Sequence, residues 1–211
     1  MNNCILKSKN SVRRFATMSA GCTLAALSLA AAPLAGQTPP SEGHFQFANI
    51  PWGSPDSVVT ARLADAGFTF SKKDKDGDLW YEGNLKGQKT DVLAFMTPER
   101  QVVFIVLNLE TPDDDAIPMF RNIRDGVLTT RYGVPAANTD TIPSPDEPVD
   151  SLQEKAVRDG EENLVAIWGD PDTNDYLGIT VTEMLTVRIE YCSPLWTAEN
   201  ARRESLRDSI F

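Results

Sequence analysis

The residues of this chain that could carry out chemistry are mainly carboxylates, which occur 30 times among 211 residues. Two acid-rich segments, 74–78 and 170–175, have the oxygen-donor composition that calcium prefers. A calcium loop of the helix–loop–helix type that began at residue 74 would need glycine at its sixth position and glutamate at its twelfth. Those positions hold Leu79 and Leu85. We therefore interpret both segments as solvated hairpin turns, and the sequence predicts no metal site and no cofactor.

Nucleophilic catalysis and zinc binding also lack a suitable residue set. His44, the single histidine, lies close to the expected start of the exported chain, where a zinc site or a histidine-based triad is not expected. Cys192 ends an expected strand, and no histidine that could activate its thiol lies near it in the sequence. Carboxylates are so frequent that neither Glu82 nor Glu183 stands out as an acid–base catalyst. The sequence thus predicts no catalytic residue.

Three aromatic residues, Trp80, Tyr81 and Trp168, lie on expected strands that occupy similar places in the two halves of the chain. Large aromatic side chains commonly fill protein cores, which is one interpretation of all three. If they face the uncovered side of a sheet, they would instead mark a surface for a partner or a ligand. They are our candidate partner-binding residues, and the sequence leaves both interpretations open.

Residues 1–36 have the composition of an export signal. Basic residues form the start, and an apolar run rich in alanine and leucine covers 15–32. This order is typical of a secretory signal, cleaved here between Ala35 and Gln37. This apolar run is short for a helix that crosses a bilayer. We expect the general secretory route to deliver residues 37–211 to the periplasm or the cell exterior, without a transmembrane anchor.

Two other export signals are compatible with parts of this leader. Arg13 and Arg14 resemble the pair of a twin-arginine signal, although Phe15 follows them without a spacer. Residues 19–22 resemble the box of small residues before a bacterial lipoprotein cysteine, which would be Cys22. Much of the apolar run follows Cys22, where the mature lipoprotein would have to begin, so we favour the secretory signal.

The exported chain is strongly acidic. The whole sequence has a formal charge of −10, and the leader carries four positive charges and no acid, so residues 37–211 carry −14. This charge disfavours nucleic acids and anionic membranes as partners, and it suits a soluble protein or one with a cationic partner. Cys192 is the only cysteine after the leader, so no internal disulfide can form and the core alone must hold the fold.

Helix and strand signals alternate in an order that predicts an α+β fold. Ser54 and Pro55 have the types expected at a helix start, so a helix is predicted over 55–66, and a second begins near Asp113. The other predicted elements are strands at 44–50, 68–71, 79–83, 91–97, 101–109, 164–169, 176–183 and 185–191, an acidic loop at 136–149, and helices at 151–159 and 197–208.

The pattern falls into two halves, about 44–110 and 111–196, each with a helix followed by three strands. Such an order predicts one antiparallel sheet with the helices packed on one face. The stretch 101–109 is apolar on both faces, which is typical of a central strand. We therefore expect a single domain over 37–211, closed by the C-terminal helix at 197–208.

The segment 50–55, Ile-Pro-Trp-Gly-Ser-Pro, together with the tandem helix and three-strand units, resembles bacterial envelope modules of the SmpA/OmlA (outer-membrane assembly lipoprotein) and beta-lactamase-inhibitor-protein type. In those modules a short glycine turn precedes a helix that packs on an antiparallel sheet. The resemblance covers most of the exported chain in the order of its elements. The lipoprotein cysteine of the first group and the disulfides of the second are absent, so the resemblance implies a fold and not a specific activity.

These observations predict an exported, non-enzymatic binding or adaptor protein of the bacterial cell envelope. Its partner is an unknown protein or small ligand and not a nucleic acid. Two alternatives stay open. One is a hydrolase that uses carboxylates, alone or with calcium, and the single histidine counts against it. The other is a lipidated component of envelope assembly, which requires Cys22 to carry the lipid.

Overall fold

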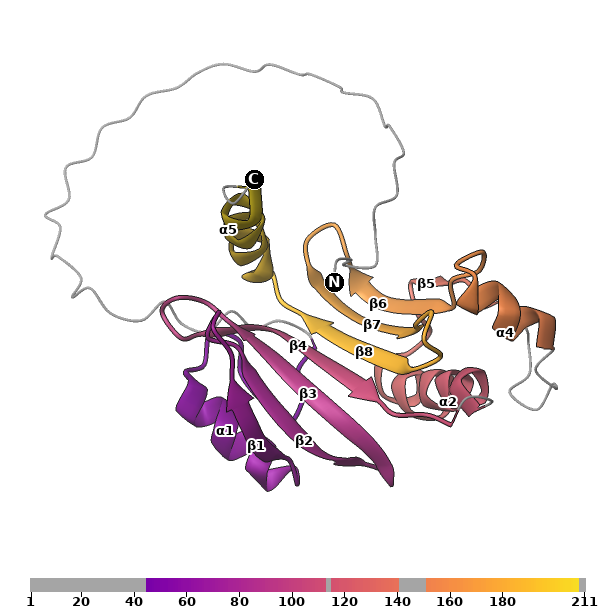
Figure 1. The fold of residues 1–211 in the computed structure, drawn as a ribbon, viewed down its shortest axis with the longest axis horizontal. Helices are drawn as coiled ribbons and strands as arrows, with labels where there is room; N and C mark the ends of the chain where they lie inside the picture. Colours follow the sequence, from indigo (N-terminus) through magenta and orange to yellow (C-terminus); the bar gives the residue numbers. More distant parts are fainter. Residues whose placement is uncertain (1–44, 113–114, 141–150, 209–211) are drawn as a thin grey trace, which may run out of the picture. The chain divides into compact units, whose positions relative to one another are not determined.

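An antiparallel sheet of eight strands is the framework of the described structure (Figure 1). The computed structural model describes residues 45–112, 115–140 and 151–208, all within one unit, Thr38–Phe211. The strand order is β1-β2-β3-β4-β8-β7-β6-β5, and each neighbouring pair is antiparallel. The expected export signal, with Cys22, and His44 lie outside the described residues.

Most elements begin and end within a few residues of their predicted positions. The strands are β1 (Thr69–Lys73), β2 (Leu79–Leu85), β3 (Gln88–Met96), β4 (Val102–Leu109), β5 (Ala137–Asn138), β6 (Val165–Asp170), β7 (Asp175–Val181) and β8 (Val187–Cys192). The helices are α1 (Asp56–Asp65), α2 (Ala116–Ile123), the π-helical turn η2 (Arg124–Thr129), α3 (Thr130–Tyr132), α4 (Ser151–Arg158) and α5 (Trp196–Asp208). The predicted α+β fold with an antiparallel sheet is confirmed. Within the described ranges, no helix has the length and apolarity needed to cross a bilayer.

Each half of the chain contributes four strands to the sheet, where the repeat pattern predicted three. The first half supplies β1 to β4 and the second supplies β5 to β8. The last strands of the two halves, β4 and β8, pair in the middle of the sheet, with Leu107 opposite Ile189. The sequence missed β5, which is only two residues long and lies in a segment predicted to be a loop.

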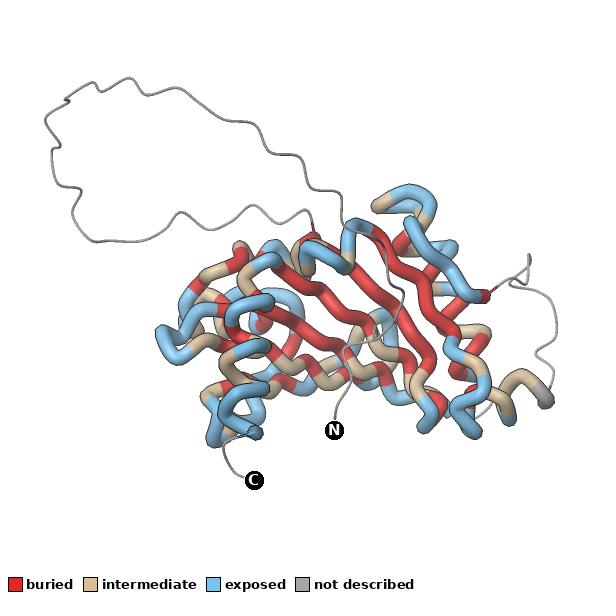
Figure 2. The backbone as a smooth tube through the Cα atoms, turned by 90° about the horizontal axis from the view of Figure 1, so that it is seen from above, coloured by how far each residue is buried: buried red, intermediate tan, exposed pale blue. Residues whose placement is uncertain are grey.

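The main core lies between the sheet and helices α1 and α2. Side chains alternate along a strand, so Ile105 and Leu107 of β4 point to the same face. They belong to one buried cluster with Val59 and Leu63 of α1 and with Phe120 of α2. Figure 2 shows buried residues running the length of the central strands. The prediction that 101–109 is a central strand is confirmed, because Val106 on the opposite face is also only 6% exposed.

Helix α5 lies on the other face of the sheet from α1 and α2 (Figure 1). The ring of Trp196 packs against the rings of Phe104 and Phe95, with centroid distances of 4.9 and 5.2 Å. The prediction that the helices pack on one face is therefore wrong for α5. The physical reason is that these two phenylalanines leave an apolar surface on the second face, beside the turn at Pro194 that ends β8.

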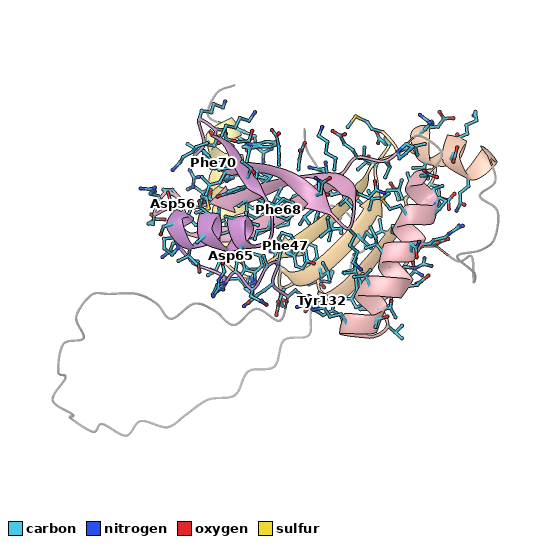
Figure 3. All side chains as sticks on the ribbon, turned by 90° about the horizontal axis from the view of Figure 1, so that it is seen from below. Phe47, Asp56, Asp65, Phe68, Phe70 and Tyr132 are labelled. Atoms are coloured by element: carbon cyan, nitrogen blue, oxygen red, sulfur yellow. The ribbon has the colours of Figure 1, made fainter. Side chains whose placement is uncertain are left out.

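Residues 45–50 form a turn and not the predicted strand. Ala48 and Asn49 have φ angles of 50° and 53°, in the left-handed region that a strand does not use. Phe47 nevertheless packs against the core, with its ring centroid 5.8 Å from that of Phe68 and 5.6 Å from that of Tyr191. Figure 3 shows Phe47 beside Phe68 on the α1 side of the sheet. The alternation of apolar residues here reflects burial of rings rather than strand pairing.

The turn before α1 is tied to the start of β4. The N–H of Gly53 donates to the carbonyl of Val102, and the N–H of Val102 donates to the carbonyl of Ser54, at 2.9 and 3.0 Å. Trp52 is fully buried in the core. The prediction that Ser54 caps the helix is wrong, because Pro55 is the N-cap residue and no side chain makes a capping hydrogen bond. Pairing with the sheet, rather than a cap, fixes the start of α1.

The outer strand of the first half, β1, is exposed along its whole length. Its pairing with β2 shifts by one residue between Phe70 and Lys72, which leaves Ser71 as a bulge. The strand ends with Lys72 and Lys73. It is therefore short, irregular and charged at its end.

Candidate binding face

The side chains on the face that carries α5 form three rows across the sheet, and we call this surface the α5 face. Because the register of every strand is known, each row can be followed from strand to strand. The middle row is Trp80, Leu93, Val106, Glu190, Gly178 and Ile167. The row nearer α5 is Phe95, Phe104, Cys192, Tyr176 and Gly169, and the row farther from α5 is Glu82, Asp91, Asn108, Arg188, Thr180 and Val165.

The character of the α5 face changes from one row to the next. The row nearer α5 is aromatic, and Trp196 covers part of it. The far row is polar over most of its length, with Glu82 exposed and Asn108 half-buried. The middle row is apolar except at Glu190. Val106, Glu190 and Ile167 are buried, so Trp80 and Leu93 are the half-buried side chains of the middle row. Two large half-buried apolar side chains beside a polar row have the composition expected of a protein-binding patch.

Glu190 is the unusual residue of this face. Its side chain lies in the middle row between Val106 and Gly178, and only 2% of the residue is exposed. The hydroxyl of Tyr176 donates a hydrogen bond to its Oε2 at 3.4 Å, which is long for an O–H···O bond. Burial raises the pKa of the Glu190 carboxyl to about 7, against the opposing effects of Arg188 and the Tyr176 hydrogen bond. A large fraction of this group is therefore protonated at neutral pH.

The nearest cation on the same strand, Arg188, is engaged elsewhere. Its Nε donates to Oδ1 of Asn108 on β4 at 3.0 Å. Among the ion pairs of the described residues, none joins Arg188 to Glu190. The arginine lowers the pKa of the carboxyl without pairing with it.

Trp80 is the one residue of the three sequence candidates that lies on the α5 face, where it is half-buried. Its Nε1 donates to Oδ2 of Asp74 at 3.2 Å, and Nζ of Lys72 lies 4.9 Å from the ring centroid. These contacts fix the ring near the outer edge of the first half. The ring has surface left for a partner.

Tyr81 and Trp168 lie on the opposite face, inside the core. Tyr81 is 1% exposed and its hydroxyl shares a hydrogen bond of 2.8 Å with Thr60 of α1. Trp168 is 2% exposed, and its Nε1 donates to the carbonyl of Gly133 at 2.7 Å. Their rings fill the space between sheet and helices. The structure thus does not bring the three candidates together.

The acid-rich segments form hairpin turns, as predicted, but the prediction that their acids are solvated is wrong for Asp78, which is 3% exposed and pairs with Arg203. Oδ1 of Asp74 accepts hydrogen bonds from the N–H groups of Asp76 and Asp78, both at 3.0 Å, so the carboxylate organises the turn between β1 and β2. The segment 170–175 spans the turn between β6 and β7. Across the described ranges, no group of three or more His, Cys, Asp or Glu side chains could hold a metal ion.

The other titratable residues considered from the sequence are also placed. Cys192 lies on the α5 face, fully buried, with its Sγ 3.9 Å from the carbonyl of Ser193. Glu82 accepts a hydrogen bond from the Ser71 hydroxyl at 2.8 Å, and Glu183 is exposed. Neither glutamate lies beside Glu190 in the strand register.

One end of the α5 face is closed by a buried ion-pair network that anchors α5. Both terminal nitrogens of Arg203 donate to the carboxylate of Asp78 at 2.7 Å, and one of them also donates to the carbonyl of Met96 at 2.8 Å. Nε of Arg203 donates to Glu199. Sequence reasoning missed this contact, although the spacing of Glu199 and Arg203, four residues apart on a predicted helix, was a visible signal of pairing.

A second buried network lies under α2, away from the α5 face. Asp140 accepts hydrogen bonds from Nε of Arg121 at 2.9 Å and from Nη1 of Arg124 at 2.7 Å. Both arginines are almost fully buried. Nη2 of Arg121 also reaches Gln153 of α4 at 3.1 Å, so the network ties α4 to α2. Its role is to hold helices together.

Sequence reasoning also missed Glu190 as a site residue. The alternation along 185–191 placed Glu190 with Arg188 and Cys192 on one side of a strand, but it did not show that this side is buried. Comparison with family models, with curated proteins and with solved structures gave no match, so the site is interpreted from its geometry.

Proposed function

We propose that this chain is an exported, non-enzymatic binding protein of the bacterial cell envelope that engages its partner through the α5 face. The observation that carries the proposal is the composition of the middle row. Trp80 and Leu93 are half-buried and adjacent in register, and their strand neighbours Tyr81 and Val92 point the other way, into the core. Protein interfaces typically have an apolar centre, often with a tryptophan, and a polar rim. Here Trp80 and Leu93 would form the centre, and the polar far row would form the rim.

The proposal that the protein is exported depends on the composition of the leader. Residues 1–36 have a basic start, an apolar run and a small-residue end, which supports the secretory signal and a periplasmic or extracellular location. Mass spectrometry of the native protein tests this directly. We expect a chain that begins near Gly36 or Gln37, whereas an acylated chain beginning at Cys22 would favour the lipidated component of envelope assembly.

We also propose that the two halves are related units. Each consists of a helical segment and a four-stranded meander, and the two meanders meet at β4 and β8. This arrangement, with the turn at 52–55, supports the resemblance to the SmpA/OmlA and beta-lactamase-inhibitor-protein type of envelope module. The Trp-Gly turn of the first unit has no counterpart near Asp113.

Purification of the exported protein from native envelopes after cross-linking tests the binding function. The variant Leu93→Arg places a charge in the centre of the α5 face and is expected to lose the partner recovered with the natural chain. Met184→Arg is the matched control, because Met184 is 72% exposed in a turn outside the α5 face. Equal recovery with both variants would refute binding through this face.

A second candidate function, a hydrolase that uses carboxylates, is favoured by Glu190 alone. A carboxyl group with a pKa of about 7 beside a tyrosine hydroxyl has the properties of a general acid. Chromogenic esters, glycosides and phosphates incubated with the exported protein test this candidate. It requires a turnover that Glu190→Gln removes.

A further inference from the structure

The part of the α5 face that a partner can reach lies over β2 and β3, because the middle row is buried where it crosses β4 and β8. Helix α5 packs on β3 at Phe95. On the same face of β3, Leu93 and Asp91 lie beyond this contact, and both are half-buried. Opposite them in register on β2 are the half-buried Trp80 and the exposed Glu82. We call these four residues the outer patch.

Two like charges face each other across the outer patch. Glu82 of β2 lies directly opposite Asp91 of β3. Side chains at such positions have Cβ atoms about 4.5 to 5.5 Å apart, and like charges there destabilise a pair of strands. The Ser71 hydroxyl donates to Oε1 of Glu82 at 2.8 Å, but it brings no charge. The fold therefore keeps an unfavourable contact at its surface that a cation would relieve.

The cations near the two acids are engaged by other groups. Nζ of Lys89 lies 2.6 Å from a carboxylate oxygen of Glu110. Nζ of Lys72 lies 4.9 Å from the centroid of the tryptophan ring of the patch. Farther along the same row, Nε of Arg188 donates to Asn108 at 3.0 Å. Among the ion pairs of the described residues, none includes either acid of the outer patch.

The apolar pair of the outer patch, Trp80 with Leu93, lies beside the acidic pair on the same face. Residues on one face of a strand are two positions apart, which is about 6.6 to 6.8 Å. An arginine or a lysine packs its methylene stem on apolar surface and keeps its charged end in water. A stem along the apolar pair would therefore bring the charge to the two carboxylates. An uncharged or acidic side chain would match only the apolar half of the patch.

The charge of the whole chain favours the same class of partner. Residues 37–211 carry a formal charge of −14, which increases the rate of encounter with basic molecules. We propose that the outer patch binds a basic protein segment, one arginine of which lies along Trp80 and Leu93 with its guanidinium between Glu82 and Asp91. The planar guanidinium suits this position because its several donors can bond two carboxylates together. This inference rests on the proposed binding function and specifies the chemistry of the partner.

A peptide titration followed by backbone amide chemical shifts of the exported protein tests the proposal. The probe is an N-acetylated, C-amidated hexapeptide that alternates arginine with serine. In its counterparts, either citrulline, which has the shape of arginine without its charge, or glutamate replaces every arginine. The arginine peptide is expected to shift amides of β2 and β3, and the counterparts are expected to bind at least about fivefold more weakly. Equal binding of the citrulline peptide would overturn the proposal.

The same spectra report on another occupant of the patch. Amides of β2 and β3 that shift with protein concentration in the absence of peptide would mean that a second copy of the chain binds there. That result would also overturn the proposal.

The double variant Glu82→Gln/Asp91→Asn removes both carboxylates of the patch. It is expected to weaken binding of the arginine peptide by about tenfold, as for two exposed ion pairs lost together. The matched control is Glu161→Gln/Glu183→Gln, because both of these glutamates are exposed, lie outside β2 and β3, and change the net charge equally. The control should weaken binding less than about twofold. Similar weakening in the two double variants would mean that only the overall charge attracts the peptide, and the proposed site would fail.

Removal of the opposed charges gives a second measurement that needs no peptide. Asp91→Asn ends the repulsion with Glu82 and is expected to raise the urea concentration at the midpoint of unfolding. A lower midpoint would show that cations of the chain itself already stabilise these acids, and it would contradict the proposal.

Recovery of the native partner separates this inference from the binding function. If Glu82→Gln/Asp91→Asn retained the partner recovered from envelopes while Leu93→Arg lost it, the binding function would stand and the role of the two acids alone would fail.

Discussion

Glu190 makes a distinctive contribution to stability because it is buried without an ion-pair partner among the described residues. The pKa of Glu190 is about 7 in the folded chain and near 4.5 in the unfolded chain. Between pH 4.5 and pH 7, the carboxyl is therefore mostly ionised in the unfolded state and mostly protonated in the folded state. Stability from this group is therefore lost as pH rises from about 4.5 to 7, and the loss levels off above that range. The total is on the order of 3 kcal/mol, from the pKa difference.

The variant Glu190→Gln should remove this pH dependence. We expect the variant and the natural chain to differ little at pH 4.5, and the variant to be more stable by on the order of 2 to 3 kcal/mol at pH 8. Urea denaturation at several pH values measures the difference. A difference that stays constant between pH 4.5 and 8 would contradict the raised pKa.

Gly169 is a second residue whose identity the structure requires. Its φ is +86°, and a Cβ atom added there would lie 2.3 Å from the carbonyl oxygen of Asp175. Gly87 has nearly the same φ of +89°, and a Cβ atom added there would meet nothing within 4 Å. An alanine at 87 therefore measures the cost of the backbone conformation without the cost of a clash. We expect Gly87→Ala to cost about 1 to 2 kcal/mol and Gly169→Ala about 2 kcal/mol more. Thermal melting of both variants checks this, and equal costs would argue against the clash.

At the scale of elements, α5 depends on one arginine. Arg203→Ala removes both hydrogen bonds to Asp78 and leaves that acid buried and unpaired, which should cost about 3 kcal/mol. Arg202, which also pairs with Glu199 but is more exposed, is the control, and Arg202→Ala should cost less than about 1 kcal/mol. Chemical denaturation compares the two. Similar losses would mean that α5 is held by Trp196 and not by the ion pair.

Most elements could be predicted from the sequence because their signals are local. The alternation along 101–109 and the glycines and aspartates of the hairpin turns gave β4 and its neighbours nearly their observed bounds. The strand predicted at 44–50 is wrong because the rings of Phe45, which is buried, and Phe47, which is partly buried, pack on the core from a turn. Alternation of apolar residues alone cannot distinguish such a turn from a strand. The capping prediction at Ser54 failed because a distant strand, β4, fixes that backbone.

The candidate site was less predictable, because it depends on which face of the sheet each helix covers. Trp80 and Tyr81 are neighbours in the sequence, yet one lies on the α5 face and the other in the core. Sequence alternation predicts that they point to opposite sides, but it does not say which side is covered. The importance of Glu190 likewise follows from contacts between residues up to 80 positions apart, such as Arg188 with Asn108.

At the scale of the whole sheet, the two halves share one seam, formed by β4 and β8. Leu107 and Ile189 face each other there, and both are almost completely buried. Leu107→Ala should therefore destabilise both halves together, by about 3 kcal/mol. Tryptophan fluorescence and far-ultraviolet circular dichroism should report the same single transition. Two separate transitions would show that the halves unfold independently.

The outer strand β1 carries features that oppose the addition of another chain at this edge of the sheet. An exposed edge strand offers free backbone groups to which another chain can add. The bulge at Ser71 interrupts the regular spacing of those groups, and Lys72 and Lys73 would place charges against an added strand. Replacing both lysines by threonine and valine should let copies of the chain join edge to edge, as larger species in sedimentation. Ser71, Lys72 and Lys73 thus protect this one edge of the sheet from further strands, and they do so independently of whatever the α5 face binds.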